Sequence, residues 1–283
     1  MSVELVCKDT KLSLRPTVLM GVLNVTPDSF SDGGLWLDPE AAIPHAIDMV
    51  SQGAGIVDVG GESTRPGAAP VSEDDELQRV LPVIEALAGA ISVPISIDTR
   101  KPGVAAAAIE AGASIVNDTS GEEFDPEMDV VAARTGAAIV IMHSRGTPAT
   151  MKTLTDYDDV VRETTAFLTR RAEEATEAGV STSSIALDPG IGFAKTPQQS
   201  LQLLAGLDEL AGTGWPVVVG TSRKSFIGAT LAVPEDQWLE GTAATVAWAV
   251  VHGAHVVRVH DVEAMSRVVR MTEAIAASRE PAE

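Results

Sequence analysis

The run Val18-Leu19-Met20-Gly21-Val22-Leu23-Asn24-Val25 is almost entirely apolar, and Ile56-Val57-Asp58-Val59 is a second run of this kind. Between them, residues 39–52 are typical of a helix, with Asp38 in the N-cap position and Pro39 in the first helical position. Near-continuous apolar runs are expected of parallel strands that are buried on both faces. Residues 18–59 therefore predict one strand–helix–strand unit.

The same unit recurs along the chain. Residues 72–88 and 158–178 are further helical patterns, and eight apolar runs occur in all, at residues 18–25, 56–59, 95–97, 114–116, 138–142, 185–187, 217–219 and 256–259. Eight strand–helix alternations predict an α/β fold of the (β/α)8 (TIM) barrel type. An open doubly wound sheet is the alternative, but no G-x-G-x-x-G follows the first run and the sequence has no P-loop.

The first fifteen residues follow a different pattern. Short extended runs at residues 3–7 and 12–14 flank a polar segment, which predicts an N-terminal β-hairpin that caps the bottom of the barrel. Because no linker or low-complexity segment interrupts the chain, we expect one domain over residues 1–283.

Composition excludes several classes of function. The 283 residues include 40 acidic and 20 basic residues, a net charge of −20, so we expect no nucleic-acid partner and no docking on an anionic membrane. An apolar fraction of 45% and a mean hydropathy of +0.15 predict a large buried core. A single cysteine (Cys7), no signal peptide and no long apolar run favour a soluble, cytoplasmic protein.

Polar or ionisable side chains follow every apolar run, at the point where each strand is expected to end. In such a barrel the active site lies at the carboxyl ends of the strands, so we expect these side chains to meet at one face. They are Asn24, Asp58, Asp98, Asn117, Asp118, His143, Asp188, residues 221–224, Arg258 and His260.

The chemistry of these side chains predicts the kind of substrate. Asp98, Asn117 and Asp188 end apolar strands, where an unpaired carboxylate is costly, so they need N–H donors, such as the amino and amide edge of a flat heterocycle. Arg65, Lys224, Arg258 and His260 form an opposing cationic group. Four cations at one mouth of an acidic protein predict an anionic substrate, most simply one that bears phosphate.

Other polar groups are expected to be structural. Asp58 is expected to bind loop amides, and the acidic run at residues 73–76 to be the solvated start of a helix. No cluster of His and Cys with zinc-ligand spacing is present in the sequence.

Several loop motifs resemble those of the dihydropteroate synthase family. Residues 20–34 resemble its first signature, and Asp58-Val59-Gly60-Gly61-Glu62-Ser63-Thr64-Arg65-Pro66-Gly67 resembles its second. Shorter matches are residues 96–99, 116–118, 142–148, 187–195, 220–226 and 258–261. The resemblance extends from about residue 3 to residue 275.

The resemblance implies folate biosynthesis. A magnesium-dependent homodimer would join para-aminobenzoate to 6-hydroxymethyl-7,8-dihydropterin diphosphate, release pyrophosphate, and be a target of sulfonamides. Lys224, Asp98, Arg258 and His260 would be the catalytic residues. The substrate-binding residues implied are Thr64, Arg65, Asp98, Asn117, Met142, Asp188, Phe193, Gly220, Ser222, Lys224, Arg258 and His260.

Within that set, the resemblance assigns Asp98, Asn117, Asp188 and Lys224 to the pterin ring. It assigns Arg258 and His260 to the phosphates, with Asn24 as the Mg²⁺ ligand, and Thr64, Arg65 and Ser222 to the aminobenzoate end. The loop residues implied are Asp28, Ser29, Phe30 and Pro66.

Two alternatives remain open from the sequence. One is a pterin-dependent methyltransferase domain, which would need neither the loop with Asp28, Ser29 and Phe30 nor the segment at residues 222–224. The other is a non-catalytic pterin-binding paralogue, which Mg²⁺-dependent release of pyrophosphate would exclude.

Overall fold

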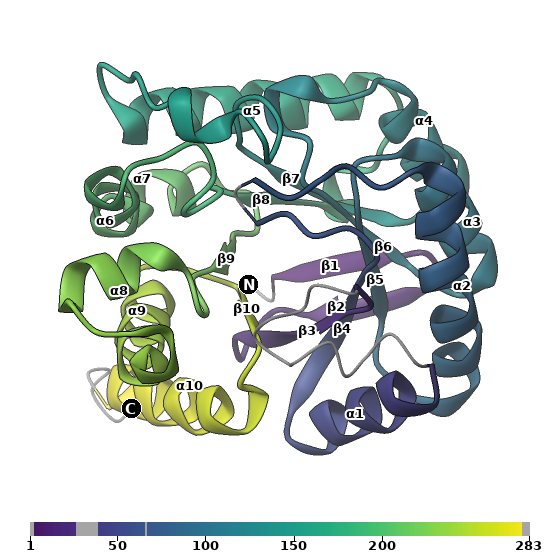
Figure 1. The fold of residues 1–283 in the computed structure, drawn as a ribbon, viewed down its shortest axis with the longest axis horizontal. Coiled ribbons are helices and arrows are strands. Elements are labelled where there is room, and N and C mark those ends of the chain that lie inside the picture. The colour runs from purple at the N-terminus through teal and green to yellow at the C-terminus, as the bar shows by residue number, and fades with distance from the viewer. Residues whose placement is uncertain (1–2, 27–38, 66, 279–283) are drawn as a thin grey trace.

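Eight parallel strands form a closed barrel with helices around its outside (Figure 1). The computed structural model describes residues 3–26, 39–65 and 67–278. The strand order is β8-β7-β6-β5-β4-β3-β10-β9. A bridge between Leu187 and Val217 joins the two outer strands of that order and closes the barrel. The predicted (β/α)8 barrel is confirmed.

The strands of the barrel are β3 (Val18–Asn24), β4 (Ala54–Gly60), β5 (Ile95–Thr99), β6 (Ile115–Asp118), β7 (Ala138–Met142), β8 (Ile185–Asp188), β9 (Val218–Gly220) and β10 (Val256–Val259). The helices are α1 (Pro39–Ser51), α2 (Glu73–Ala90), α3 (Pro102–Ala111), α4 (Glu127–Thr135), α5 (Val160–Glu177), α6 (Pro197–Ala205), α7 (Leu207–Ala211), α8 (Ser225–Leu231), α9 (Leu239–Val251) and α10 (Val262–Ala277).

The N-terminal hairpin is also confirmed. Strands β1 (Glu4–Cys7) and β2 (Thr10–Ser13) pair in antiparallel fashion. Leu5, Cys7 and Leu14 pack with Val18 and Ile56 in the apolar cluster that fills the barrel interior. The hairpin therefore buries the apolar bottom of the barrel.

Alternation along the strands explains how the site is positioned. Leu19 and Val57 belong to the outer cluster beneath the helices, whereas their neighbours Met20 and Ile56 belong to the inner cluster. Side chains two residues apart on a strand share a face. The inner face consequently changes from apolar to polar near the carboxyl ends, from Ile56 to Asp58, Ile115 to Asn117, Ala186 to Asp188 and Val256 to Arg258.

Helix α2 departs from the expected solvated start. Ser72 is its N-cap and accepts a hydrogen bond from the backbone N–H of Asp75 at 3.1 Å. Glu76, in the same first turn, is fully buried. The expectation for residues 73–76 is wrong at Glu76 because its helical position faces the barrel, where Lys101 contacts it.

No helix in the described part of the chain is both long and apolar enough to cross a membrane.

Gly190 gives a test of the loop that follows β8. Its φ is +64°, and a Cβ there would lie 1.9 Å from the carbonyl oxygen of His143. We expect Gly190→Ala to lower the free energy of unfolding by at least about 2 kcal/mol in urea denaturation, because the backbone must move. Gly89→Ala is the control, since no heavy atom lies within 4 Å of its Cβ position, and its effect should stay within about 1 kcal/mol. Equal stability of the two variants would contradict the close packing of this loop against His143.

Candidate active site

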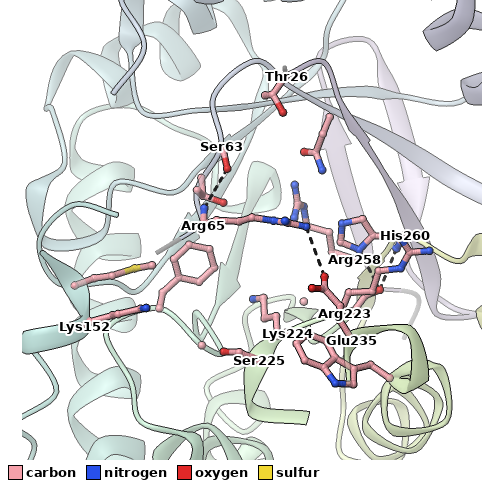
Figure 2. A pocket seen from close by; sticks show the side chains of 18 residues that line it. Thr26, Ser63, Arg65, Lys152, Arg223, Lys224, Ser225, Glu235, Arg258 and His260 are labelled. Carbon is pink, nitrogen blue, oxygen red and sulfur yellow. Dashed lines mark hydrogen bonds and ion pairs between the residues drawn. The ribbon is translucent and has the colours of Figure 1, made fainter. Parts of the chain in front are cut away.

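A cavity of about 380 Å³ opens at the carboxyl ends of the strands (Figure 2). Loops that follow β3, β4, β7, β8, β9 and β10 contribute to its wall. The lining residues are Asn24, Thr26, Ser63, Thr64, Arg65, Met151, Lys152, Gly192, Phe193, Gly220, Ser222, Arg223, Lys224, Ser225, Glu235, Trp238, Arg258 and His260. The structure thus brings together nine of the predicted site residues around one cavity: Asn24, Thr64, Arg65, Phe193, Gly220, Ser222, Lys224, Arg258 and His260.

Four further predicted residues, Asp98, Asn117, Met142 and Asp188, are buried at the strand ends outside this lining. Arg258 joins the two groups. Arg258 lines the cavity, and its guanidinium donates from Nε to Asp58 Oδ2 at 2.6 Å and from Nη2 to Asp98 Oδ2 at 2.7 Å. The buried acids and the cavity are therefore parts of one site.

Asp58 lies at the expected face of the barrel, but its partners differ from those predicted from the sequence. The sequence assigns it to loop amides, but its Oδ2 accepts from Arg258 and, at 3.1 Å, from Asn117 Nδ2. It is fully buried, and its Oδ1 has no hydrogen-bond partner among the described residues.

Burial dominates the electrostatics around Arg258. Desolvation raises the pKa of Asp98 to about 7, although the neighbouring Arg258 charge opposes the shift. Thr119 donates to the other oxygen of Asp98 at 3.3 Å. The carboxylates of Asp58 and Asp98 in turn raise the pKa of Arg258 despite its burial. Arg258 therefore stays charged while Asp98 titrates near neutrality.

Asp188, which is buried, and Lys224, which is half-buried, are a second set of opposite charges at the site. Asp188 Oδ1 accepts from the backbone N–H of Gly190 at 2.7 Å, and burial raises its pKa. Lys224 Nζ donates to the carbonyl of Ile191 at 2.5 Å and lies 4.6 Å from the centre of the Phe193 ring. Burial lowers the pKa of Lys224 to about 8, and the nearby Asp188 opposes that shift.

His260 corrects one expectation about charge. Its Nδ1 lies 3.1 Å from Ser222 Oγ, which also accepts from the His260 backbone N–H at 3.2 Å. Burial and then the charges of Arg258 and Arg223 lower its pKa well below the ordinary value. This shift favours the neutral ring of His260, in contrast to the fourth cation expected from the sequence.

Arg65 and Thr64 reach the cavity from the loop after β4. Arg65 Nη2 lies 3.8 Å from Glu235 Oε1, so the two side chains approach each other across the mouth (Figure 2). The predicted loop residues Asp28, Ser29, Phe30 and Pro66 lie outside the described residues.

Lys195 and His143 support the Asp188 loop from behind. Lys195 Nζ lies 2.9 Å from His143 Nδ1 and donates to the carbonyls of His143 and Phe193 at 3.3 and 2.9 Å. These three groups surround the Lys195 nitrogen, and burial lowers the pKa of Lys195 well below its ordinary value. Burial lowers the pKa of His143 to about 2, which keeps its ring neutral and able to accept. In the sequence, Lys195 stands out only as part of a motif, without a role.

No group of three or more His, Cys, Asp or Glu side chains that could hold a metal ion occurs within residues 3–26, 39–65 and 67–278. Asn24, the predicted Mg²⁺ ligand, does line the cavity.

A parallel barrel with buried acids and a cationic cavity at its carboxyl ends defines a barrel enzyme that binds a polar, anionic small molecule. Residues 20–260 match the family model described as "Pterin binding enzyme". The chain belongs to this family of pterin-binding enzymes and, within it, to the dihydropteroate synthases. Its activity is therefore that of a dihydropteroate synthase, which is a transferase.

Three relatives support that assignment. The dihydropteroate synthase of Synechocystis is 50% identical over 264 residues, which cover 92% of this chain and 91% of the relative. The Yersinia pestis enzyme, solved with a sulfonamide drug, has a TM-score of 0.93 and 42% identity and covers 97% of this chain and 99% of its own. The Xanthomonas albilineans enzyme, solved with 4-aminobenzoic acid, has a TM-score of 0.90 and 40% identity. The match covers 98% of this chain and 99% of that enzyme.

The two shifted pKa values predict how activity depends on pH. Asp98, with a pKa raised to about 7, loses its charge as pH falls through that value, and Lys224, with a pKa lowered to about 8, loses its proton as pH rises through that value. If both charges are needed, kcat/KM for the pterin substrate is bell-shaped with a maximum between these values. Asp98→Asn should remove the acid limb but keep the alkaline one. A flat profile from about pH 6 to about pH 9 would contradict both roles.

Proposed function

We propose that this chain condenses 6-hydroxymethyl-7,8-dihydropterin diphosphate with para-aminobenzoate in one site, with the residue roles that follow. The observation that best supports this proposal is the position of Arg258, which both lines the cavity and contacts the buried acids. A substrate with a heterocycle at one end and a diphosphate at the other suits a site that is acidic at its base and cationic at its mouth.

The pterin ring binds at the buried base. Its 2-amino group and ring N–H are donors, which the carboxylate of Asp188 can accept as a pair. Asn117 and Asp98 contact the same edge, and Lys224 donates to the pterin carbonyl. Phe193, already in contact with Lys224, covers a face of the ring, and Met142, which pairs in register with Asp188 on the neighbouring strand, lies below it.

The diphosphate binds at the cationic part of the cavity. Arg258 and the neutral His260 contact its oxygens, His260 as a hydrogen-bond partner rather than as a charge. During the reaction the C–O bond to the diphosphate breaks, and the leaving group takes the electron pair. The electron-rich dihydropterin supports a carbocation at its exocyclic methylene, so the step is dissociative, and positive charge near the leaving oxygens lowers its barrier.

The aminobenzoate supplies the nucleophile. Its aniline nitrogen forms the new C–N bond and then loses a proton, so no catalytic triad is needed. Thr64, Arg65 and Ser222 line the cavity where the acceptor would enter. Solved relatives hold 4-aminobenzoic acid or a sulfonamide drug, which supports an aminobenzoate as the acceptor.

Magnesium fits the donors that are present. Mg²⁺ keeps several waters and is commonly held by one or two protein oxygens together with substrate phosphates, rather than by a cage of side chains. The Oδ1 of Asn24 lies beside Gly60 at the strand ends, and it would be the protein ligand. When bound, the ion would neutralise charge on the leaving diphosphate.

The two alternative functions are less well supported. The segment at residues 222–224 would be dispensable in a pterin-dependent methyltransferase domain, yet all three of its residues line the cavity. A non-catalytic paralogue would not need Lys224 and Arg258 to face the same cavity as Arg65.

Activity tests the proposal directly. We expect pyrophosphate release that requires Mg²⁺, the pterin diphosphate and para-aminobenzoate. Lys224→Gln should lower kcat/KM by at least about tenfold, because a donor and a charge at the pterin carbonyl are lost. Lys11→Gln, on the exposed edge of the N-terminal hairpin, should leave it unchanged. If the unaltered protein forms no product, the proposed reaction is wrong.

Asp188→Asn tests the pterin end separately. It replaces an acceptor by a donor that faces the donors of the pterin, so we expect calorimetric binding of the pterin to weaken by about 1.5–3 kcal/mol. Unchanged affinity would remove Asp188 from the pterin contacts.

We also propose that the chain is a homodimer that works in the cytoplasm. Trp248 and Val251 on α9 and Met271 and Ile275 on α10 are 48–64% exposed, and the two helices pack side by side (Figure 1). Such a cluster of large apolar side chains is typical of a subunit interface. The cytoplasm suits Cys7, which is free and buried.

The dimer proposal can be tested by light scattering on a sizing column. Met271→Glu should give a monomer, because it buries a charge in the proposed interface. Ile47→Glu, which changes an exposed residue of α1, should stay dimeric. A dimer that survives both changes would place the interface elsewhere.

A further inference from the structure

The loop that carries Thr64 and Arg65 is held from outside the cavity by a lysine. Lys101, just before α3, contacts Glu62 of this loop and donates to Glu76 Oε2 of α2 at 2.5 Å. The three residues come from three different segments of the chain, and Lys101 is not among the residues that line the cavity. Its contacts therefore serve the loop rather than a ligand.

Burial of Glu76 makes a neighbouring cation necessary. Glu76 is fully buried, and its Oε1 has no partner among the described residues. Burial acts against the charge of Lys101, but the hydrogen bonds to Glu62 and Glu76 outweigh it and raise the pKa of Lys101. Because a buried carboxylate is costly without a cation, Glu76 fixes Lys101, and Lys101 then fixes Glu62.

Other contacts fix the loop on both sides of Glu62. The carbonyl of Gly61 accepts from Arg79 Nη1 of α2 at 2.8 Å. At the far end, the backbone N–H of Gly67 donates to the carbonyl of Pro148 at 2.9 Å. Between the loop and the ends of β5 and β6 is a space of about 10 Å³, which is room for about one water molecule. Thr64 and Arg65 are thus carried on a short segment that is anchored at both ends.

We propose that Lys101 is a positioning residue for the acceptor substrate: through Glu62 it sets where Thr64 and Arg65 stand in the cavity. The inference rests on the proposed function, in which these two residues serve the aminobenzoate end. The pterin contacts come from the strand ends and from Lys224, and the hydrogen bonds of Asp98, Asp188 and Lys224 do not include Lys101 or Glu62. Glu76 does act on this end through its charge, which helps to raise the pKa of Asp98. Loss of the bridge should therefore affect one substrate and spare the other.

Glu62→Ala is the direct test. It removes the contact between the loop and Lys101 but leaves the Lys101–Glu76 pair and the contacts of Gly61 and Gly67 intact, so the fold should be retained. We expect KM for para-aminobenzoate to rise by about tenfold, because small displacements of binding groups cost this much or more. The KM for the pterin diphosphate should change by less than about twofold.

A second pair of variants separates positioning from stability. Lys101→Met alone leaves Glu76 buried without a cation and is expected to unfold more easily. Lys101→Met combined with Glu76→Gln removes that charge, so we expect the melting temperature to recover while KM for para-aminobenzoate stays high. Recovery of both quantities would show that Lys101 serves stability only.

The control is a buried ion pair away from the loop. Arg171 on α5 bonds Asp129 on α4 at 3.1 Å, and both side chains are buried. Arg171→Met combined with Asp129→Asn should lower stability without changing either KM. If it raises KM for para-aminobenzoate as much as Glu62→Ala does, or if Glu62→Ala changes neither KM, the proposed role of Lys101 is overturned. Failure of the unaltered protein to form product would instead count against the proposed function.

Discussion

The ion pairs of Arg258 with Asp58 and Asp98 are the contacts on which the site depends. Two carboxylates at the centre of a barrel are costly unless a cation and hydrogen bonds compensate them. Arg258 supplies that cation from β10, 200 residues along the chain from Asp58, and Asn117 and Thr119 complete the set. The same guanidinium faces the cavity, so the group that makes the acids tolerable is also available to an anionic substrate.

Two loops beside this centre are held in a similar way, each by a lysine that lies behind it. Lys101 joins two glutamates behind the loop of Arg65, and Lys195 joins two carbonyls and a neutral histidine behind the loop of Asp188. Each lysine is partly or fully withdrawn from solvent and acts on backbone that lies next to the cavity. Loops are the most variable parts of a barrel, so buried charge of this kind keeps binding groups in place without adding to the wall that the substrate touches.

The distribution of charge also gives different roles to the pterin end and the diphosphate end of the site. Desolvation raises the pKa of Asp98 and Asp188 and lowers the pKa of Lys224. Groups with perturbed pKa values gather where chemistry is performed, and here they surround the expected pterin edge. His260 is kept neutral by burial and the neighbouring arginines, so positive charge at the diphosphate end comes from Arg258, with Arg65 nearer the mouth.

Local patterns along the chain are enough to predict the barrel and the face that carries the site. Strand-length apolar runs are local, and parallel strands of a closed barrel must bring their carboxyl ends together, so Asp98, Asn117, Asp188 and Arg258 could be assigned to one face. The partners of each charge depend on tertiary packing. The sequence places Asp58 at the right face but not its partner Arg258, and it leaves Glu76 in solvent, because Arg258 and Lys101 belong to other segments of the chain. The lowered pKa of His260 likewise depends on cations from other segments. Burial and pairing energies arise only when those segments pack together.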